Sequence, residues 1–199
     1  MGGTDTTSAA LEWAMSELVR NPIIMKKVQE EVRTIVGHKS NVEERDVNKM
    51  HYLKCVIKET LRMHPPVALV VPRVTRSDIK LKGYDIPAKT TVHINAWAIQ
   101  RDPKFWESPE EFLPERFENS EVDFKGQDSQ FIPFGFGRRG CPGMNFGTAS
   151  VEYMLANLLY WFDWKLPETD TQDIDMNEIF GLVVSKQVPL HLKPTTYAF

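Results

Sequence analysis

The stretch from Phe131 to Gly143, which reads FIPFGFGRRGCPG, constrains this chain more than any other part of it. It places Cys141 in a turn with glycines at positions 135, 137, 140 and 143. Glycine allows the backbone to take positive φ values and to approach a ligand closely. Helically spaced apolar residues follow as far as about Phe162, and they predict one broad apolar face: Met144, Phe146, Ala149, Val151, Met154, Leu155, Leu158 and Leu159. We therefore predict a cysteine-bearing turn that leads directly into a helix.

The surroundings of Cys141 indicate a reactive or ligating sulfur. The positive end of the following helix and the charges of Arg138 and Arg139 favour a thiolate over a thiol. A thiolate in an apolar turn is a soft metal ligand. A structural cysteine packed in a loop is the alternative, and the adjacent arginines argue against simple core packing.

The glycines of this stretch also match a dinucleotide-binding fingerprint, Gly135-x-Gly137-x-x-Gly140. That motif requires a buried strand before it and a helix opening at its end. Pro133 interrupts the preceding run, and the turn at Cys141 falls where the helix should begin. A dinucleotide-binding module is therefore the least favoured functional hypothesis for this chain.

The pattern Phe134-x-x-Gly137-x-Arg139-x-Cys141-x-Gly143 resembles the haem-binding signature of the cytochrome P450 family, the haem-thiolate monooxygenases. The resemblance implies that the chain holds haem b and that Cys141 is the proximal iron ligand. It further implies that Arg139 pairs with a haem propionate, and that Phe134, Gly137 and Gly143 shape the loop around the cofactor.

The start of the chain allows two interpretations. From the residues alone, Thr4, Asp5 and the neighbouring threonines form an N-cap cluster. Gly2-Gly3-x-Asp5-Thr6-Thr7 also resembles the oxygen-activation segment of the family's long central helix. The resemblance implies that Asp5 and Thr6 deliver protons to bound O2, as general acids do, and that Gly2 and Gly3 make room in the substrate pocket.

The segment Glu59-x-x-Arg62 lies on a helix predicted from His51 to His64, which ends at Pro65-Pro66. Such an i,i+3 pair is commonly a weak surface interaction. It also resembles the helix pair of the same family, which an arginine of the segment Pro114-Glu115-Arg116-Phe117 joins. The resemblance implies a structural role for Glu59, Arg62 and Arg116.

Two further segments resemble the substrate-lining parts of that family. Val67 to Val71 reads as a short strand or extended run, and an arginine near its end, Arg73, can reach a propionate. Ile179 to Val184 resembles the last substrate-lining turn. The pocket candidates from the two segments are Ala68, Leu69, Val70, Val71, Phe180, Leu182 and Val183.

The remaining patterns predict further helices and short strands, so the predicted fold is mainly α with small β-sheets, of the α+β class. The family resemblance implies that this fold is the C-terminal part of the cytochrome P450 fold. All of residues 1–199 form one partial domain. The other expected elements are a helix from about Asp5 to Asn21, a helix from Pro22 to Gly37, a hairpin from Ile79 to Pro87, a strand from Thr91 to Ile94, a meander from Gln100 to Phe117, an acidic loop from Glu168 to Asp175 and a terminal strand from Gln187 to Lys193.

Composition excludes some function classes and leaves others open. A net charge of −3 does not suggest nucleic-acid binding. The chain's two cysteines lie far apart in the sequence and in different surroundings, so they do not suggest a disulfide framework. No apolar run reaches the length that spans a bilayer.

The family resemblance implies a monooxygenase that oxidises a small, largely apolar molecule with O2. Its electrons come from NADPH through an NADPH-cytochrome reductase. The segments around Pro114 and Asp163 resemble those of plant microsomal members. This resemblance implies a role in secondary metabolism at the cytosolic face of the endoplasmic reticulum membrane. It also implies membrane association through an N-terminal anchor that this chain lacks. The alternative is a truncated, non-catalytic remnant that does not hold haem alone.

Overall fold

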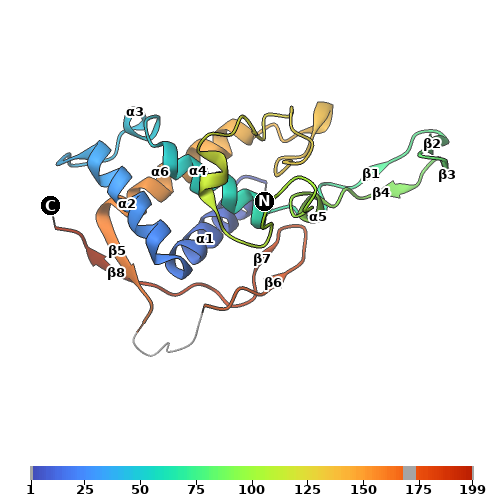
Figure 1. Ribbon diagram of the computed structural model, residues 1–199. Coiled ribbons are helices and arrows are strands. Elements are labelled where there is room, and N and C mark those ends of the chain that lie inside the picture. Colours follow the sequence, from blue (N-terminus) through green and yellow to red (C-terminus); the bar gives the residue numbers. More distant parts are fainter. Residues whose placement is uncertain (1, 168–173, 199) are drawn as a thin grey trace.

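The computed structural model describes residues 2–167 and 174–198, so most of the acidic loop expected from Glu168 to Asp175 lies outside the described residues. Its longer helices pack into one body, and a β-arm, formed by the strands of residues 73–92, projects from it (Figure 1). The helices are α1 (Asp5–Arg20), α2 (Pro22–Val36), α3 (Glu44–Val47), α4 (His51–Met63), α5 (Ala96–Ile99) and α6 (Met144–Trp161), with 3₁₀ turns η1 (Pro114–Phe117) and η2 (Gly137–Arg139).

Local sequence signals explain where the helices begin and end. Pro22 opens α2, where its fixed φ suits the first turn and its missing N–H is not needed. Gly37, with φ 65°, terminates the same helix. The first turn of α4 is capped from α2, because the Glu31 carboxylate accepts hydrogen bonds from the amides of Tyr52 and Leu53, each at 2.8 Å. These boundaries agree with the predicted helices.

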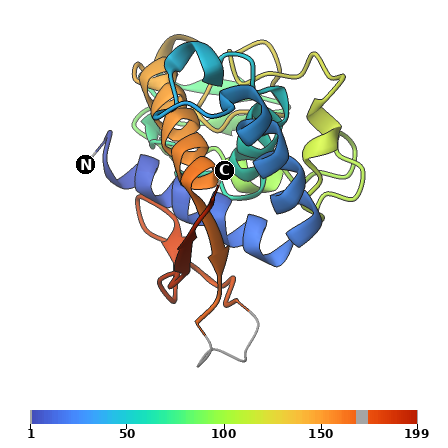
Figure 2. The same ribbon diagram turned by 90° about the vertical axis from the view of Figure 1, so that its left-hand side faces the viewer.

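The core lies between α1, α2, α4 and α6, which pack on one another. Figure 2 shows α6 within this bundle, with β5 and β8 extending from its C-terminal end. Burial of a valine, leucine, methionine or phenylalanine side chain contributes roughly 1.5–3 kcal/mol of transfer free energy. The apolar residues with 0% exposure are Trp13, Ala14, Leu18, Val28, Val32, Met50, Leu53, Val56, Ala96, Phe131, Leu155, Ala156, Leu159 and Tyr160.

The strands form antiparallel pairs in the described part of the chain. The expected hairpin is present, and Lys82 and Gly83 take φ values of 49° and 89°, as a tight two-residue connection requires. It stands at the tip of the arm, beyond the β1–β4 pair (Figure 1). The pairs are β1 (Arg73–Val74) with β4 (Thr91–Val92), β2 (Ile79–Leu81) with β3 (Tyr84–Ile86), β5 (Phe162–Lys165) with β8 (Lys193–Thr196), and β6 (Glu178–Ile179) with β7 (Ser185–Lys186).

The prediction of a short strand or extended run from Val67 to Val71 is wrong. The Val70 amide donates to the Val67 carbonyl at 3.1 Å, and Val70 takes φ 50°, so the chain turns here. Pro72 has no amide to continue a ladder, and the first strand begins only at Arg73.

The terminal strand also differs from its prediction, because β8 begins at Lys193 instead of Gln187. Pro189 has no donor, and the Leu190 amide bonds to the Glu12 carboxylate at 2.9 Å. The strand predicted from Thr91 to Ile94 is shorter than expected and ends at Val92.

The apolar face of α6 is narrower than the sequence predicted. Val151, Leu155 and Leu159, spaced at i, i+4 and i+8, point into the core, whereas Phe146 and Met154 are 75% and 51% exposed. Apolar composition therefore overstates the buried face of this helix. None of the described helices combines the length and the apolar character needed to cross a membrane.

Candidate functional site

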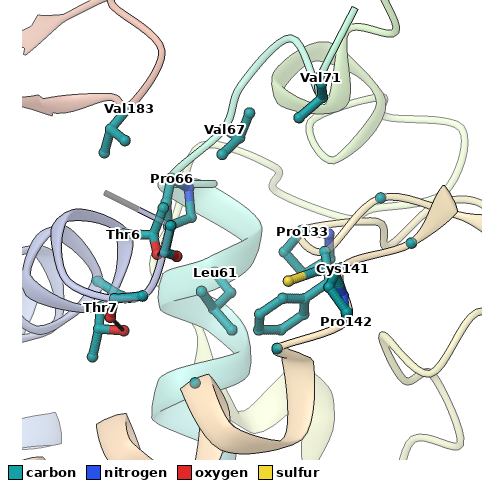
Figure 3. Close-up of a pocket in the computed structure, with 18 of the residues that line it drawn as sticks. Thr6, Thr7, Leu61, Pro66, Val67, Val71, Pro133, Cys141, Pro142 and Val183 are labelled. Carbon is teal, nitrogen blue, oxygen red and sulfur yellow. Dashed lines mark hydrogen bonds between the residues drawn. The ribbon is translucent and has the colours of Figure 1, made fainter. Parts of the chain in front are cut away.

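A cavity of about 700 Å³ opens between the first turn of α1, the C-terminal half of α4 and the cysteine turn before α6. Figure 3 shows Cys141 and Pro142 on one side of it and Thr6 and Thr7 on the other, with Leu61 and Val67 between them. The cavity brings together residues that lie far apart in the sequence. Most of its wall is apolar, which suits a ligand with large apolar faces.

The cysteine turn presents an accessible sulfur to this cavity. Gly135 and Gly137 take φ values of 74° and 69°, which reverse the chain, and the Cys141 amide donates to the Phe134 carbonyl at 2.8 Å. Cys141 is exposed and unpaired, and its sulfur points toward the cavity (Figure 3). A Cβ added to Gly143 would lie 3.9 Å from this sulfur, in ordinary van der Waals contact with it.

The helix behind the sulfur begins without a side-chain cap. Gly143 is the N-cap residue of α6, and no side chain of the described residues caps the first amides of the helix. The positive end of α6 therefore lies close behind the cysteine.

The opposite wall carries hydroxyl groups from α1. Thr6 Oγ1 donates to the Gly2 carbonyl at 3.0 Å, and Thr7 Oγ1 donates to the Gly3 carbonyl at 2.8 Å. Thr4 is the N-cap residue but makes no side-chain cap bond, so the threonines do not cap the helix as the residues alone suggested.

The oxygens of these hydroxyls remain able to accept a hydrogen bond. Asp5 lies on the same wall and is exposed. An added Cβ at Gly2 or Gly3 would meet nothing within 4 Å, so packing within the described chain does not require glycine at either position.

Arginines form a positive rim. Arg73 Nη2 donates to the Arg139 carbonyl at 3.0 Å, and both residues line the large cavity and a smaller adjoining one of about 260 Å³. Neither forms an ion pair with a carboxylate within residues 2–167 and 174–198. These guanidinium groups can receive an anionic group of a ligand in the cavity.

The structure separates the predicted pocket residues into two groups. Val70, Val71, Leu182 and Val183 line the cavity, as do Gly2, Gly3, Asp5, Thr6, Arg73, Phe134, Arg139, Cys141 and Gly143. Ala68, Leu69, Phe180 and Gly137 are outside its lining.

Backbone hydrogen bonds hold two of the four residues outside the lining, Ala68 and Gly137, in local turns. The Ala68 carbonyl accepts from Trp97 at 3.1 Å, which turns this buried residue toward α5. Leu69 and Phe180 are 48% and 63% exposed. Gly137 begins η2 and bonds through its carbonyl to Gly140.

Several wall residues were not predicted. Ile57 and Leu61 stand one turn apart on α4, and Phe146 and Val151 reach the cavity from α6. The i,i+4 spacing of Ile57 and Leu61 marks a buried helix face but does not distinguish a cavity wall from a packed core. Only the approach of α1 and the cysteine turn makes that distinction.

Glu59, Arg62 and Arg116 form a buried network behind the cavity. Arg62 Nε and Nη2 donate to the two Glu59 carboxylate oxygens at 2.8 and 2.9 Å, and both side chains are 0% exposed. Arg116 Nε donates to Glu59 Oε1 at 3.0 Å. Arg62 Nη1 also donates to the Gln100 carbonyl at 2.9 Å, so the network ties α4 to the meander.

Gln100 joins the end of α4 to the start of the cysteine turn, which the sequence did not reveal. Pro65 and Pro66 have no amides, so the carbonyls of Leu61 and Arg62 lack helical donors. Gln100 Nε2 donates to both at 2.9 Å, and its Oε1 accepts from the Ile132 amide at 2.9 Å.

The glycine fingerprint at Gly135 lacks the setting that dinucleotide binding needs. In the described chain no strand leads directly into it, η2 lies within it, and the cysteine turn separates it from α6. The described sheets are antiparallel pairs without a βαβ unit.

Comparisons with known proteins agree on one family. A family model described as cytochrome P450 matches residues 1–194. Phenylacetaldehyde oxime monooxygenase CYP71AN24 of Prunus mume is 58% identical, over 100% of this chain and 38% of the relative. Cytochrome P450 71A1 of Persea americana is 61% identical, over 96% of this chain and 38% of the relative.

A solved structure of zebra fish cytochrome P450 with abiraterone superposes with a TM-score of 0.86 at 30% identity. It covers 98% of this chain and 44% of the zebra fish chain. The present chain therefore spans less than half the length of the known proteins it matches.

Proposed function

The chain belongs to the cytochrome P450 family, and we propose that it contributes the cysteine-ligand half of a haem-dependent monooxygenase site. The reaction would insert one oxygen atom of O2 into a small, largely apolar organic molecule. The observation that carries this proposal is the exposed Cys141 sulfur, which faces the Thr6 wall across an apolar cavity with an arginine rim.

The residues around the cavity fit haem b. Cys141 offers one soft ligand at the positive end of α6, and Phe134 and Leu61 offer apolar surface to a flat macrocycle. Arg139 and Arg73, which have no carboxylate partner in the described chain, would receive the propionates. When bound, the haem would supply the iron for O2 chemistry, and thiolate ligation favours O–O cleavage.

The chain's own residues would then act in two ways. Asp5 and Thr6 would hold and pass a proton at the α1 wall, where an exposed carboxylate and a hydroxyl group both line the cavity. Val67, Leu182 and Val183 would exclude water from the substrate and contact its apolar surface.

We further propose electron supply from NADPH through an NADPH-cytochrome reductase, at the cytosolic face of the endoplasmic reticulum membrane. Family membership supports both expectations. One relative is named as a phenylacetaldehyde oxime monooxygenase, so a small aromatic aldoxime is a reasonable first compound to test. Secondary metabolism in a plant is the corresponding biological setting.

The test is the absorption spectrum of the haem-loaded chain, reduced and exposed to carbon monoxide. We expect a strongly red-shifted Soret band that Cys141→Ser abolishes. Cys55→Ser is the matched control, because Cys55 is the other cysteine and is buried in α4, away from the cavity. It should leave the band unchanged.

Two results would contradict the proposal for this chain. An unchanged band in Cys141→Ser would remove the ligand assignment. Failure of the wild-type chain to retain haem would favour the non-catalytic alternative, because the described cavity would then be insufficient to hold the cofactor.

A further inference from the structure

His64 lies at the C-terminal end of α4, outside the lining of the cavity, and is buried. Its Nε2 is 2.8 Å from Glu17 Oε1 on α1, and its Nδ1 is 3.1 Å from Glu178 Oε1 on β6. The Trp13 ring stacks on the imidazole with centroids 4.1 Å apart and an angle of 1° between the planes. This buried histidine therefore has two carboxylate partners.

This geometry requires a charged imidazole if both carboxylates are ionised. An ionised carboxylate only accepts hydrogen bonds, and a neutral imidazole has a single N–H. The imidazolium donates from both nitrogens and can satisfy both partners. It is also attracted to the face of the Trp13 ring.

The other charged groups around the cluster do not replace this donor. Arg20 Nη1 is 3.9 Å from Glu17 Oε2, and Lys186 Nζ lies 4.9 Å from the Trp13 ring centroid and donates to the Asp175 carbonyl. The charged residues that face the cluster from α1, β6, β7, the segment before β6 and the segment after α5 are Glu12, Glu17, Arg20, Asp175, Glu178, Lys186 and Arg101. Within the described chain, His64 is the residue that links Glu17 to Glu178.

Glu178 begins the hairpin whose turn forms part of the cavity wall. Leu182 and Val183 lie in that turn and line the cavity, and the Val184 amide donates to the Pro66 carbonyl at 2.9 Å. The turn is therefore held to the end of α4 at both of its sides, by His64 and by Pro66.

We propose that His64 is a positioning residue for this wall. When both carboxylates are ionised, the imidazolium holds Glu178 to Glu17 as a clamp and thereby sets where Leu182 and Val183 stand in the cavity. The consequence for substrate specificity rests on the proposed function, whereas the clamp itself does not.

The clamp should weaken as the pH rises. Histidine is the side chain that changes charge between roughly pH 5 and 8, and the neutral ring leaves one carboxylate without a donor. The Glu178 bond is the longer of the two, and the Glu178 side chain is 12% exposed against 2% for Glu17. Glu178 can regain water more easily, so its link should open first.

Hydrogen–deuterium exchange of the purified chain, read by mass spectrometry over residues 178–186, tests the clamp. After correction for the intrinsic pH dependence of exchange, we expect protection in the wild type to fall about tenfold as the ring loses its proton, since hydrogen bonds to charged groups are the stronger class. His64→Gln should give low protection with no such pH dependence.

Glu178→Gln distinguishes the clamp from simple packing. A glutamine amide can donate to the lone pair of Nδ1 while Nε2–H donates to Glu17, so a neutral ring satisfies both partners. We expect this variant to keep its protection across the pH range. His51→Gln, at the exposed first position of α4, is the control and should follow the wild type.

The same pH profile in the wild type and in His64→Gln would overturn the proposal. If His64→Gln loses protection throughout the chain, Glu178→Gln decides, and a retained pH dependence in that variant overturns the clamp. The exchange measurement needs no haem. A missing red-shifted Soret band therefore counts against the proposed function alone, and an unaltered exchange profile counts against the clamp alone.

Discussion

Replacement of Gln100 by methionine should destabilise the chain while leaving the size of the side chain nearly unchanged. The substitution removes the donor to the Leu61 and Arg62 carbonyls and the acceptor for the Ile132 amide. Gln100 is 0% exposed, so water does not replace these bonds without local opening. Each buried group left unpaired costs about 1–3 kcal/mol.

We expect a loss of about 3–5 kcal/mol in the free energy of unfolding, less than the sum of the maximum values, because neighbouring groups share one site and relax together. Urea denaturation followed by tryptophan fluorescence measures this loss, with the slope of the transition unchanged. Gln127→Met is the control at an exposed position and should change stability by less than about 0.5 kcal/mol.

A loss below about 1 kcal/mol for Gln100→Met would refute the reasoning, because the three bonds would then be replaceable. Gln100→Glu gives a second check. At neutral pH its carboxylate can accept from Ile132 but faces the two carbonyls without a proton. Burial and these acceptors should raise its pKa, so its deficit should be smallest below about pH 4.3, where the unfolded side chain is also protonated, and should grow as the pH rises.

Further predictions concern the buried charges and the second cysteine. Arg62→Met should cost about 3–5 kcal/mol in urea denaturation because its carboxylate partner remains buried, whereas Arg45→Met at an exposed ion pair should change little; equal effects would contradict this. The hydrogen bond from Lys39 lowers the pKa of Asp46. The ionised Asp46 carboxylate therefore stabilises the folded chain fully above about pH 3.9, and this contribution to the free energy of unfolding is lost as the pH falls. Asp46→Asn should therefore flatten the acid side of a pH series of denaturation curves. Burial raises the pKa of Cys55 to about 11 from 9.0, so its alkylation by iodoacetamide at pH 8 should be about 100-fold slower in the folded chain than in urea, as mass spectrometry would show.

Local rules were sufficient for the helices and the hairpin. Pro22, Gly37 and the Pro65-Pro66 pair act on the backbone where they stand, so the boundaries that they set can be read without a partner. The same is true of the turn at Gly83. The cysteine signature identified the family because its residue types and spacing are specific, and the comparisons confirm that assignment.

The roles of Asp5, Thr6, Arg73, Arg139 and Cys141 remain predictions, although the structure gathers all of these residues around one cavity. Their meeting was inferred from a family resemblance. Helical and β periodicities describe one element at a time and do not say which elements meet across a cavity.

Local sequence patterns were enough to predict the cysteine turn, the order and limits of the main helices, and the i,i+3 spacing of Glu59 and Arg62, because each depends on residues within a few positions of one another. Tertiary structure alone decided which side chains bond across the chain. His64 contacts Glu178, which lies 114 residues away in the sequence. Gln100 donates hydrogen bonds to the last carbonyls of α4 from more than 35 residues away. The arrangement of the helices also left apolar residues of α6 exposed, among them Phe146 and Met154. Burial and the pairing of distant groups depend on which elements approach in space, and no local pattern specifies that approach.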